Sequence, residues 1–169
     1  MKKNLVLLGM MGVGKSTLGK IVAKKQNMRF IDTDLIIEDK LAMKISEIFE
    51  IKGEDFFRLV EEKEILKLLK NSNCVVALGG GAFINKKVRN IILKNAISIW
   101  LDNDLKKLSA RTKWNKKRPL LNEENNFEKI KKLYAKRKNI YKLANYKIDC
   151  DKMSKESITK KIITYYEKH

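Results

Sequence analysis

The chain contains few of the residues from which several common kinds of site are built. Its two cysteines, Cys74 and Cys150, are too few for a disulfide framework or a four-ligand zinc site, and they are typical of small buried residues. The only histidine, His169, is the last of the 169 residues, which argues against a Ser–His or Cys–His catalytic pair. Apolar runs are far shorter than the roughly 20 residues that span a bilayer. No signal segment precedes the first run at residues 5–8, so we expect a cytoplasmic protein with no membrane partner.

Acidic residues are also scarce, since 20 Asp and Glu face 38 Lys and Arg, for a net charge of +18. Such a balance often indicates a nucleic-acid partner. Here the charge is spread as single lysines with few aromatic residues between them, so we expect no nucleic-acid partner. One run, residues 106–118, is different because it is strongly basic and contains no acid. Its basic residues are Lys106, Lys107, Arg111, Lys113, Lys116, Lys117 and Arg118.

Residues 9–16 fit the phosphate-loop pattern G-x-x-x-x-G-K-[ST] at every fixed position. The apolar run 5–8 before the loop predicts a buried strand, and apolar residues at helical spacing follow it, which is the setting of a true phosphate loop. The loop amides and the helix N-terminus would bind phosphate. Lys15 would reach the β- and γ-phosphates of ATP, and the Ser16 hydroxyl would bind Mg²⁺. The predicted ATP-binding residues of this stretch are Gly12, Val13, Gly14, Lys15, Ser16 and Thr17.

Strand and helix patterns alternate along the chain. The alternation predicts a mostly parallel sheet with helices on both faces, a three-layer α/β/α domain over residues 1–169. The polar segment 112–125 contains the only proline and exceeds most connections in length, which favours a lid. Strands are predicted at 5–8, 28–31, 74–78, 96–101 and 146–150. Helices are predicted at about 15–26, 35–41, 46–53, 54–71, 86–95, 103–111, 127–144 and after Ser154.

Two carboxylates, Asp32 and Asp34, end the second predicted strand. One interpretation is that Asp34 only caps a helix that starts at Leu35. The other is that one carboxylate holds Mg²⁺ through water while the other accepts the proton of an attacking hydroxyl. We favour the second, because a phosphate loop implies a metal and an acceptor site. Asp102, which also follows an apolar strand, is instead assigned to capping the next helix, as is Asn103.

Other polar features carry little information when each is taken alone. Gly79, Gly80 and Gly81 end the third predicted strand, which indicates either a loose turn or a surface where a substrate approaches backbone amides. Arg58 precedes Glu61 by three residues on a predicted helix, a spacing typical of a solvated ion pair.

Taken together, the motifs resemble the shikimate kinases, phosphate-loop kinases of the nucleoside-monophosphate-kinase-like group. The resemblance covers nearly the whole chain, and the order and spacing of the motifs make it specific. The motifs are GMMGVGKST at 9–17, DTD at 32–34, GEDFFRLVE at 53–61, LGGGA at 78–82, RPLL at 118–121 and LYAKRKNIY at 133–141.

The resemblance implies a P-loop kinase fold of about five parallel strands, with a lid at about 112–125 and substrate-binding helices at about 35–71. It implies transfer of the γ-phosphate of ATP to the 3-hydroxyl of shikimate, giving 3-phosphoshikimate and ADP on the route to chorismate and the aromatic amino acids. Shikimate would be bound by Asp34, Arg58, Gly79, Gly80, Gly81 and Arg137. Phe57 would pack on its ring, and Glu61 would orient Arg58.

For the donor half, the resemblance places Arg118 of the lid over the ATP phosphates and Arg111 near the adenine, and it groups Asp32 with Ser16 around Mg²⁺. Lys15, Asp34 and Arg118 would be the catalytic residues, and the enzyme would act as a monomer. One departure is Asn139, where the family usually has proline, two residues after Arg137. Two alternatives stay open here: a kinase for gluconate or a nucleoside monophosphate, and a nucleic-acid-binding protein that uses ATP as a switch.

Overall fold

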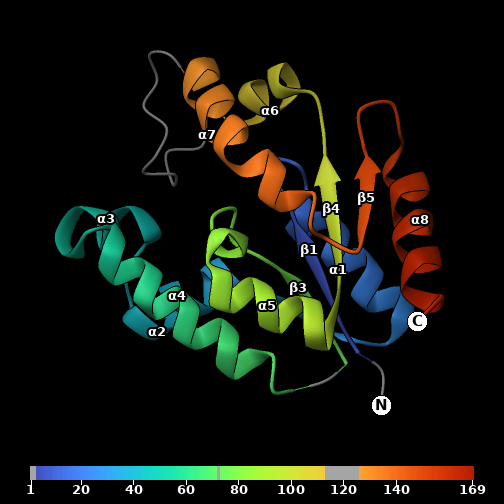
Figure 1. The fold of residues 1–169 in the computed structure, drawn as a ribbon, viewed down its shortest axis with the longest axis horizontal. Coiled ribbons are helices and arrows are strands. Elements are labelled where there is room, and N and C mark those ends of the chain that lie inside the picture. The colour runs from blue at the N-terminus through green and yellow to red at the C-terminus, as the bar shows by residue number, and fades with distance from the viewer. Residues whose placement is uncertain (1–2, 72, 113–125) are drawn as a thin grey trace.

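The computed structural model describes residues 3–71, 73–112 and 126–169, and its centre is a five-stranded sheet (Figure 1). The strand order is β2-β3-β1-β4-β5, and every neighbouring pair is parallel. The predicted α/β/α architecture is therefore confirmed. The strands are β1 (Asn4–Leu8), β2 (Arg29–Asp32), β3 (Cys74–Ala77), β4 (Ala96–Asp102) and β5 (Tyr146–Asp149).

Helices cover both faces of the sheet, with α1 and α8 on one side and α5 and α7 on the other (Figure 1). Helices α2, α3 and α4 pack on one another beside the sheet edge formed by β2. The helices are α1 (Lys15–Gln26), α2 (Thr33–Leu41), α3 (Ile45–Lys52), α4 (Glu54–Leu68), α5 (Lys86–Asn95), α6 (Leu105–Thr112), α7 (Asn126–Tyr141) and α8 (Lys155–Glu167), with a short 3₁₀ turn η1 (Ala82–Ile84) after β3.

Two apolar clusters hold these layers. The larger surrounds β1, whose five residues are all buried because both faces of the strand are covered. Helix α1 packs closely against the sheet at Gly19, where an added Cβ would lie 2.6 Å from the Phe30 ring. The smaller cluster centres on Ile37, Ile48 and Phe57, one from each of α2, α3 and α4. These three helices thus form a unit with its own small core, which sets the far wall of the site described below.

Three predicted helix starts are wrong, each by a few residues. Helix α2 begins at Thr33, and its cap is Asp32, whose carboxylate accepts the Asp34 N–H at 3.1 Å. Helix α3 begins at Ile45, ahead of the predicted cap Ser46. For α6 the carboxylate that accepts the first free amides belongs to Asp104, not to Asp102 or Asn103. Before α2 and α6 several polar residues compete for one cap, and sequence alone does not say which one leaves the helical conformation. In α3 the cap position belongs to Lys44, and the predicted cap Ser46 lies in the first turn.

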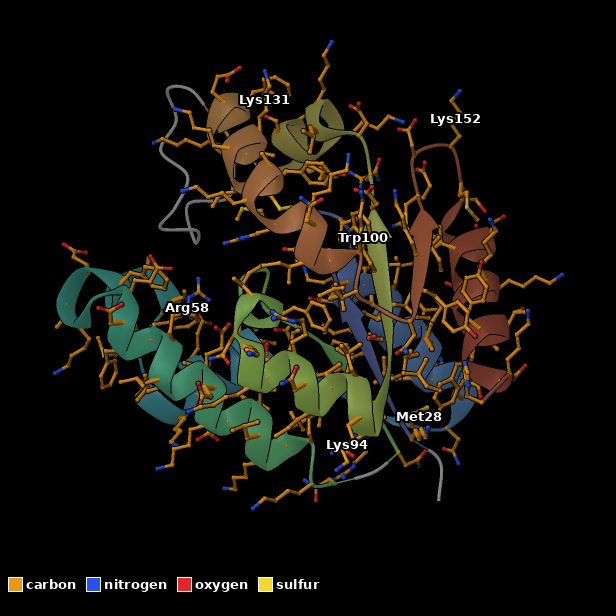
Figure 2. The ribbon with its side chains drawn as sticks, in the orientation of Figure 1. Met28, Arg58, Lys94, Trp100, Lys131 and Lys152 are labelled. Carbon is orange, nitrogen blue, oxygen red and sulfur yellow. The ribbon has the colours of Figure 1, made fainter. Side chains whose placement is uncertain are left out.

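Two predicted helix boundaries are confirmed, whereas α4 and α7 each end three residues before the predicted positions 71 and 144. The Ser154 hydroxyl accepts the Ser157 N–H at 3.1 Å, so it caps α8, and Gly53 ends α3 at φ 83°. Lysines such as Lys94, Lys131 and Lys152 lie exposed at separate places on the outside of the molecule (Figure 2). Among the described residues, no helix combines the length and apolar character required to cross a membrane.

Candidate functional site

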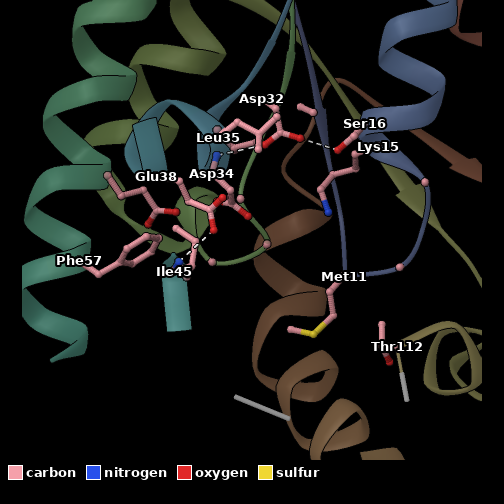
Figure 3. Close-up of a pocket in the computed structure, with 18 of the residues that line it drawn as sticks. Met11, Lys15, Ser16, Asp32, Asp34, Leu35, Glu38, Ile45, Phe57 and Thr112 are labelled. Carbon is pink, nitrogen blue, oxygen red and sulfur yellow. Dashed lines mark hydrogen bonds between the residues drawn. The ribbon is translucent and has the colours of Figure 1, made fainter. Parts of the chain in front are cut away.

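A cavity of about 530 Å³ opens at the carboxyl ends of β1, β2 and β3 (Figure 3). Parallel strands bring their carboxyl ends to one edge, which is where ligands of such sheets bind. The phosphate loop after β1 lines one side of the cavity, and α2 to α4 line the other. Its polar lining includes Lys15, Ser16, Asp32, Asp34, Arg58, Glu61, Arg111 and Arg137, together with Gly79, Gly80 and Gly81.

The phosphate loop has the backbone that its glycines permit. Gly12 and Gly14 adopt φ values of 80° and 101°, which side-chain-bearing residues rarely adopt, and Gly14 caps α1. The Lys15 Nζ donates to the carbonyls of Gly9 and Met10 at 2.8 and 3.0 Å, so the ammonium lies across the loop. The loop therefore presents a cation and the positive end of α1 at the same place, an arrangement that suits a phosphate chain.

Asp32 links the phosphate loop to β2. Its Oδ2 accepts the Ser16 hydroxyl at 2.5 Å while its Oδ1 caps α2 (Figure 3). A hydroxyl and a carboxylate in contact are the ligand types that Mg²⁺ takes in kinases, where substrate phosphates and waters complete the octahedron. The described part of the chain contains no cluster of three or more His, Cys, Asp or Glu side chains that could hold a metal ion. Ser16 and Asp32 therefore fit Mg²⁺.

Thr33, between the two acids, is a site residue that the sequence analysis missed. It is buried, and its hydroxyl accepts the Gly79 N–H at 2.9 Å. Helix α2 begins at Thr33, so Asp34 sits in the first turn of that helix and lines the cavity. In the sequence Thr33 is only a small hydroxyl residue between two acidic residues. Nothing in the sequence connects it to Gly79, which lies 46 positions later.

The three glycines after β3 allow charged side chains to lie directly against the backbone. A Cβ on Gly79 would lie 2.7 Å from both Asp34 Oδ1 and Glu61 Oε1, and one on Gly81 would lie 2.6 Å from the Arg58 guanidinium. Real Cβ atoms essentially never come so close. Gly79 and Gly81 therefore leave room for Asp34, Glu61 and Arg58 against the backbone. That a substrate approaches the amides of this loop stays a prediction.

Arg58 is held by two carboxylates of its own helix. Its Nη1 donates to Glu61 Oε2 at 2.7 Å, and its Nη2 donates to Glu54 Oε1 at 3.0 Å. Burial lowers the pKa of Arg58, but the charges and hydrogen bonds of Glu61 and Glu54 raise it by more. Burial raises the pKa of Glu61, an effect that Arg58 opposes and that the nearby Asp34 carboxylate adds to. The pair is thus a partly buried, oriented ion pair and not the solvated one that its spacing suggests when taken alone.

Two buried polar atoms at the cavity have no hydrogen-bond partner among the described residues. One is Arg137 Nη1, from a side chain that is only 7% exposed, and the other is Glu61 Oε1. A buried guanidinium nitrogen without a partner costs free energy, about 1–3 kcal/mol or more for a charged group. Arg137 Nη1 lies 3.3 Å from the place of a Cβ on Gly80. This arrangement suits an anionic ligand that reaches the cavity and satisfies Arg137.

Part of the wall opposite the phosphate loop is apolar. The rings of Phe49 and Phe57 lie 4.9 Å apart, and Phe57 is almost fully buried in the small cluster. The Glu38 carboxylate accepts the Ile45 N–H at 3.0 Å, which fixes the turn between α2 and α3 (Figure 3). Carboxylate, arginine and aromatic side chains thus meet in one cavity, as a small ring compound with hydroxyl and carboxylate groups would require.

A second hollow, of about 330 Å³, lies behind the phosphate loop. Arg111 lines both hollows, and its Nη1 donates to the Gly12 carbonyl at 3.4 Å. The segment after β5 forms the other wall, through Cys150, Met153 and Lys155. This hollow continues the phosphate site and suits the base of a nucleotide. Sequence analysis assigned only Arg111 there and missed the segment after β5.

The structure brings together nearly all the predicted site residues. The described ones line the main cavity except Val13, which lines the second hollow. Asn139 does not disturb α7, which runs unbroken through Arg137. Arg118 and most of the predicted lid lie outside the described residues.

Comparison with known proteins gives a consistent result. A protein-family model described as shikimate kinase matches residues 11–167. A shikimate kinase of Sulfurihydrogenibium sp. is 46% identical over 162 residues, covering 96% of each chain. A solved shikimate kinase from Acinetobacter baumannii, in complex with shikimate, superimposes with a TM-score of 0.94 at 32% identity, over 98% of this chain and 93% of that one. The enzyme from Aquifex aeolicus superimposes with a TM-score of 0.85 at 30% identity, over 97% and 96%.

Proposed function

The chain belongs to the shikimate kinase family, and on that premise we propose how its residues act. It is an ATP-dependent kinase that phosphorylates the 3-hydroxyl of shikimate, giving 3-phosphoshikimate and ADP. The observation that carries the residue roles is one continuous cavity with a phosphate loop on one side and two arginines, Arg58 and Arg137, on the other. Asp34 lines the same cavity.

The two arginines hold the shikimate carboxylate. Planar guanidinium groups bind carboxylates through paired N–H donors. The unpartnered Nη1 of Arg137 supports this role, because a bound carboxylate satisfies it. Glu61 and Glu54 keep Arg58 in place, and the ring of shikimate packs on the side of Phe57.

Asp34 acts as the general base for the 3-hydroxyl. Its carboxylate lies at the N-terminal turn of α2 and against Gly79, so its position is fixed by backbone. A hydroxyl that is oriented and partly deprotonated attacks the γ-phosphate in line. Proton transfer to such a base contributes roughly 10²–10⁴-fold to a rate. Gly79, Gly80 and Gly81 line the acceptor side, where their lack of side chains leaves room for the substrate.

Lys15 stabilises the charge on the transferred phosphate. A phosphate chain in the loop competes with the carbonyls of Gly9 and Met10 for the Lys15 ammonium, so Lys15 moves from them onto the β- and γ-oxygens. Ser16 and Asp32 would hold Mg²⁺, which would supply positive charge beside the phosphates. Catalysis then rests on positioning and charge stabilisation.

Several further assignments complete this proposal. Residues 1–169 act as one domain with substrate-binding helices at about 35–71. The lid at about 112–125, with Arg118 over the phosphates, stays a prediction because it lies almost wholly outside the described residues. Arg111 contacts the adenine from the edge of the second hollow. A monomeric state, a cytoplasmic location, and the absence of nucleic-acid and membrane partners also stay predictions.

The test is ADP release from the purified protein with a panel of acceptors: shikimate, gluconate, AMP and water alone. We expect a shikimate-dependent rate that needs Mg²⁺ and background rates with the other three. A folded preparation that releases ADP with gluconate or AMP but not with shikimate contradicts the proposal. If nucleic acid stimulates ATP hydrolysis and shikimate does not, the result would support the alternative of a nucleic-acid-binding protein that uses ATP as a switch.

A further inference from the structure

Tyr141 is a buried residue of α7 that the function described so far does not use. It is only 1% exposed, and it lies at the end of α7, one helical turn after Arg137. Its ring packs on Trp100 of β4, with ring centroids 5.9 Å apart, near the crossing of α7 over the sheet (Figure 2). Tyr141 is not among the described residues that line the cavity, so it acts on the site from behind.

The Tyr141 hydroxyl meets three parts of the site at once. It donates a short hydrogen bond to the Gly80 carbonyl, and the Met10 sulfur of the phosphate loop lies 3.9 Å away. Burial raises the pKa of Tyr141, while the charge of Arg137 and a hydrogen bond with its side chain lower it. The hydroxyl therefore stands between Arg137 and Gly80, and it touches the donor side through Met10.

This contact fixes the direction of one peptide in the glycine loop. In a trans peptide the C=O and the N–H point in opposite directions. Because Tyr141 holds the Gly80 carbonyl on its own side, the Gly81 N–H faces away from Tyr141, and Gly81 itself lines the cavity. Thr33 holds the Gly79 N–H at the other end of the loop, so the loop is fastened at both ends.

From these contacts we propose that Tyr141 is a positioning residue for the acceptor. Its hydroxyl holds the Gly80 carbonyl, and with it the Gly80–Gly81 peptide, beside Arg137, whose Nη1 is left for the substrate carboxylate. Tyr141 does not touch the substrate. The inference rests on the proposed function, because it assumes that the acceptor occupies the cavity beside Gly80 and Arg137.

The test is Tyr141→Phe, which removes the hydroxyl and keeps the ring on Trp100. We expect shikimate affinity, measured by calorimetry, to fall about tenfold, because one buried hydrogen bond contributes roughly that much. The KM for shikimate should rise by a similar factor. The KM for ATP should stay within about twofold of wild type, because the hydroxyl reaches the phosphate loop only through the Met10 sulfur, a weak acceptor 3.9 Å away, and the Lys15 contacts are untouched. A purely structural role would not separate the two substrates in this way.

The matched control is Tyr134→Phe, on the same helix. Its hydroxyl donates to Asp102 Oδ2 at 3.1 Å, away from the glycine loop, so shikimate affinity should not change. Two results overturn the inference: a Tyr141→Phe protein with wild-type affinity for shikimate, or one that loses affinity for ATP and shikimate equally. If the wild type itself fails to bind shikimate, the proposed function fails instead.

A crystal structure of the wild-type protein with shikimate gives a second test that does not depend on the variant folding. The inference expects the Tyr141 hydroxyl still on the Gly80 carbonyl and the Gly81 amide on the substrate side. A complex in which this peptide is turned over, with the Gly80 carbonyl on the substrate, contradicts it.

Discussion

Substitution of Gly81 by alanine adds one methyl group where the Arg58 guanidinium lies. Gly81 has φ −97° and ψ −15°, a conformation open to alanine, so the substitution tests space and not backbone strain. The new Cβ would lie 2.6 Å from Nη1 and Nη2 of Arg58, whereas ordinary contacts begin at 3.4 Å. Arg58 must therefore retreat by about 0.8 Å, or the loop must move by as much.

That retreat should weaken shikimate binding specifically. Hydrogen bonds to charged groups contribute about 1.5–3 kcal/mol, and their loss corresponds to about a 10- to 10²-fold rise in the KM for shikimate. The ADP-release assay measures both KM values: shikimate is varied at saturating ATP, and ATP is then varied at saturating shikimate. The KM for ATP should change little, because the contacts of Lys15 and Ser16 lie on the other side of the cavity.

A double-mutant cycle checks that the effect passes through Arg58. Arg58→Lys removes the guanidinium group with which the methyl group of alanine at position 81 collides. The rise in the KM for shikimate in the double variant should therefore be clearly smaller than the two separate effects combined. If Gly81→Ala leaves the KM for shikimate within about threefold of wild type, at an unchanged melting temperature, then Arg58 is free to move and the reasoning from its close contact is refuted.

Three further predictions concern the acidic residues. Asp34→Asn should lower kcat by roughly 10²–10⁴-fold and leave ATP affinity, measured by calorimetry, unchanged, whereas equal losses of both would mean that Asp34 is structural. Because the pKa of Glu61 is raised, its carboxyl binds a proton at a higher pH than an ordinary glutamate as the solution is acidified, and Arg58 then loses its charged partner. As the pH is lowered, the KM for shikimate should therefore begin to rise at a pH above the usual titration range of glutamate, and Glu61→Gln should remove this rise from a pH profile of the KM for shikimate. Asp32→Asn should increase the Mg²⁺ concentration needed for half-maximal rate, measured by metal titration at fixed ATP, and an unchanged requirement would argue against Asp32 as a metal partner.

The fold was largely predictable because its signals are local. A phosphate loop between an apolar run and an amphipathic segment is a contiguous pattern. Strands β1, β3 and β4 are short buried runs, and the presence and order of all five strands are confirmed. Two of the wrong helix starts arose where two or three polar residues compete for one cap, at Asp32 and Asp34 and at Asp102 and Asp104. Asp102 in fact accepts the Tyr134 hydroxyl and pairs with Lys147 at 2.9 Å, contacts that depend on α7 and β5.

Only those site residues could be predicted that the family resemblance or the residue type itself indicates. Arg58 next to Glu61 is an ordinary helix pair until the chain folds it against Gly81. Thr33 and Tyr141 were missed because each acts through one hydrogen bond to the glycine loop, across 46 and 61 positions of sequence. The segment after β5 was missed for the same reason, since it reaches the nucleotide side only when β5 joins the sheet.

The central claim is that one cavity holds the acceptor between Asp34 and the two arginines, facing the phosphate loop. A crystal structure with shikimate and ADP tests it most directly. We expect the shikimate carboxylate on Arg58 and on Nη1 of Arg137, with the 3-hydroxyl on Asp34 and directed at the phosphate loop. A shikimate bound elsewhere, or bound here with its carboxylate away from both arginines, would contradict the account.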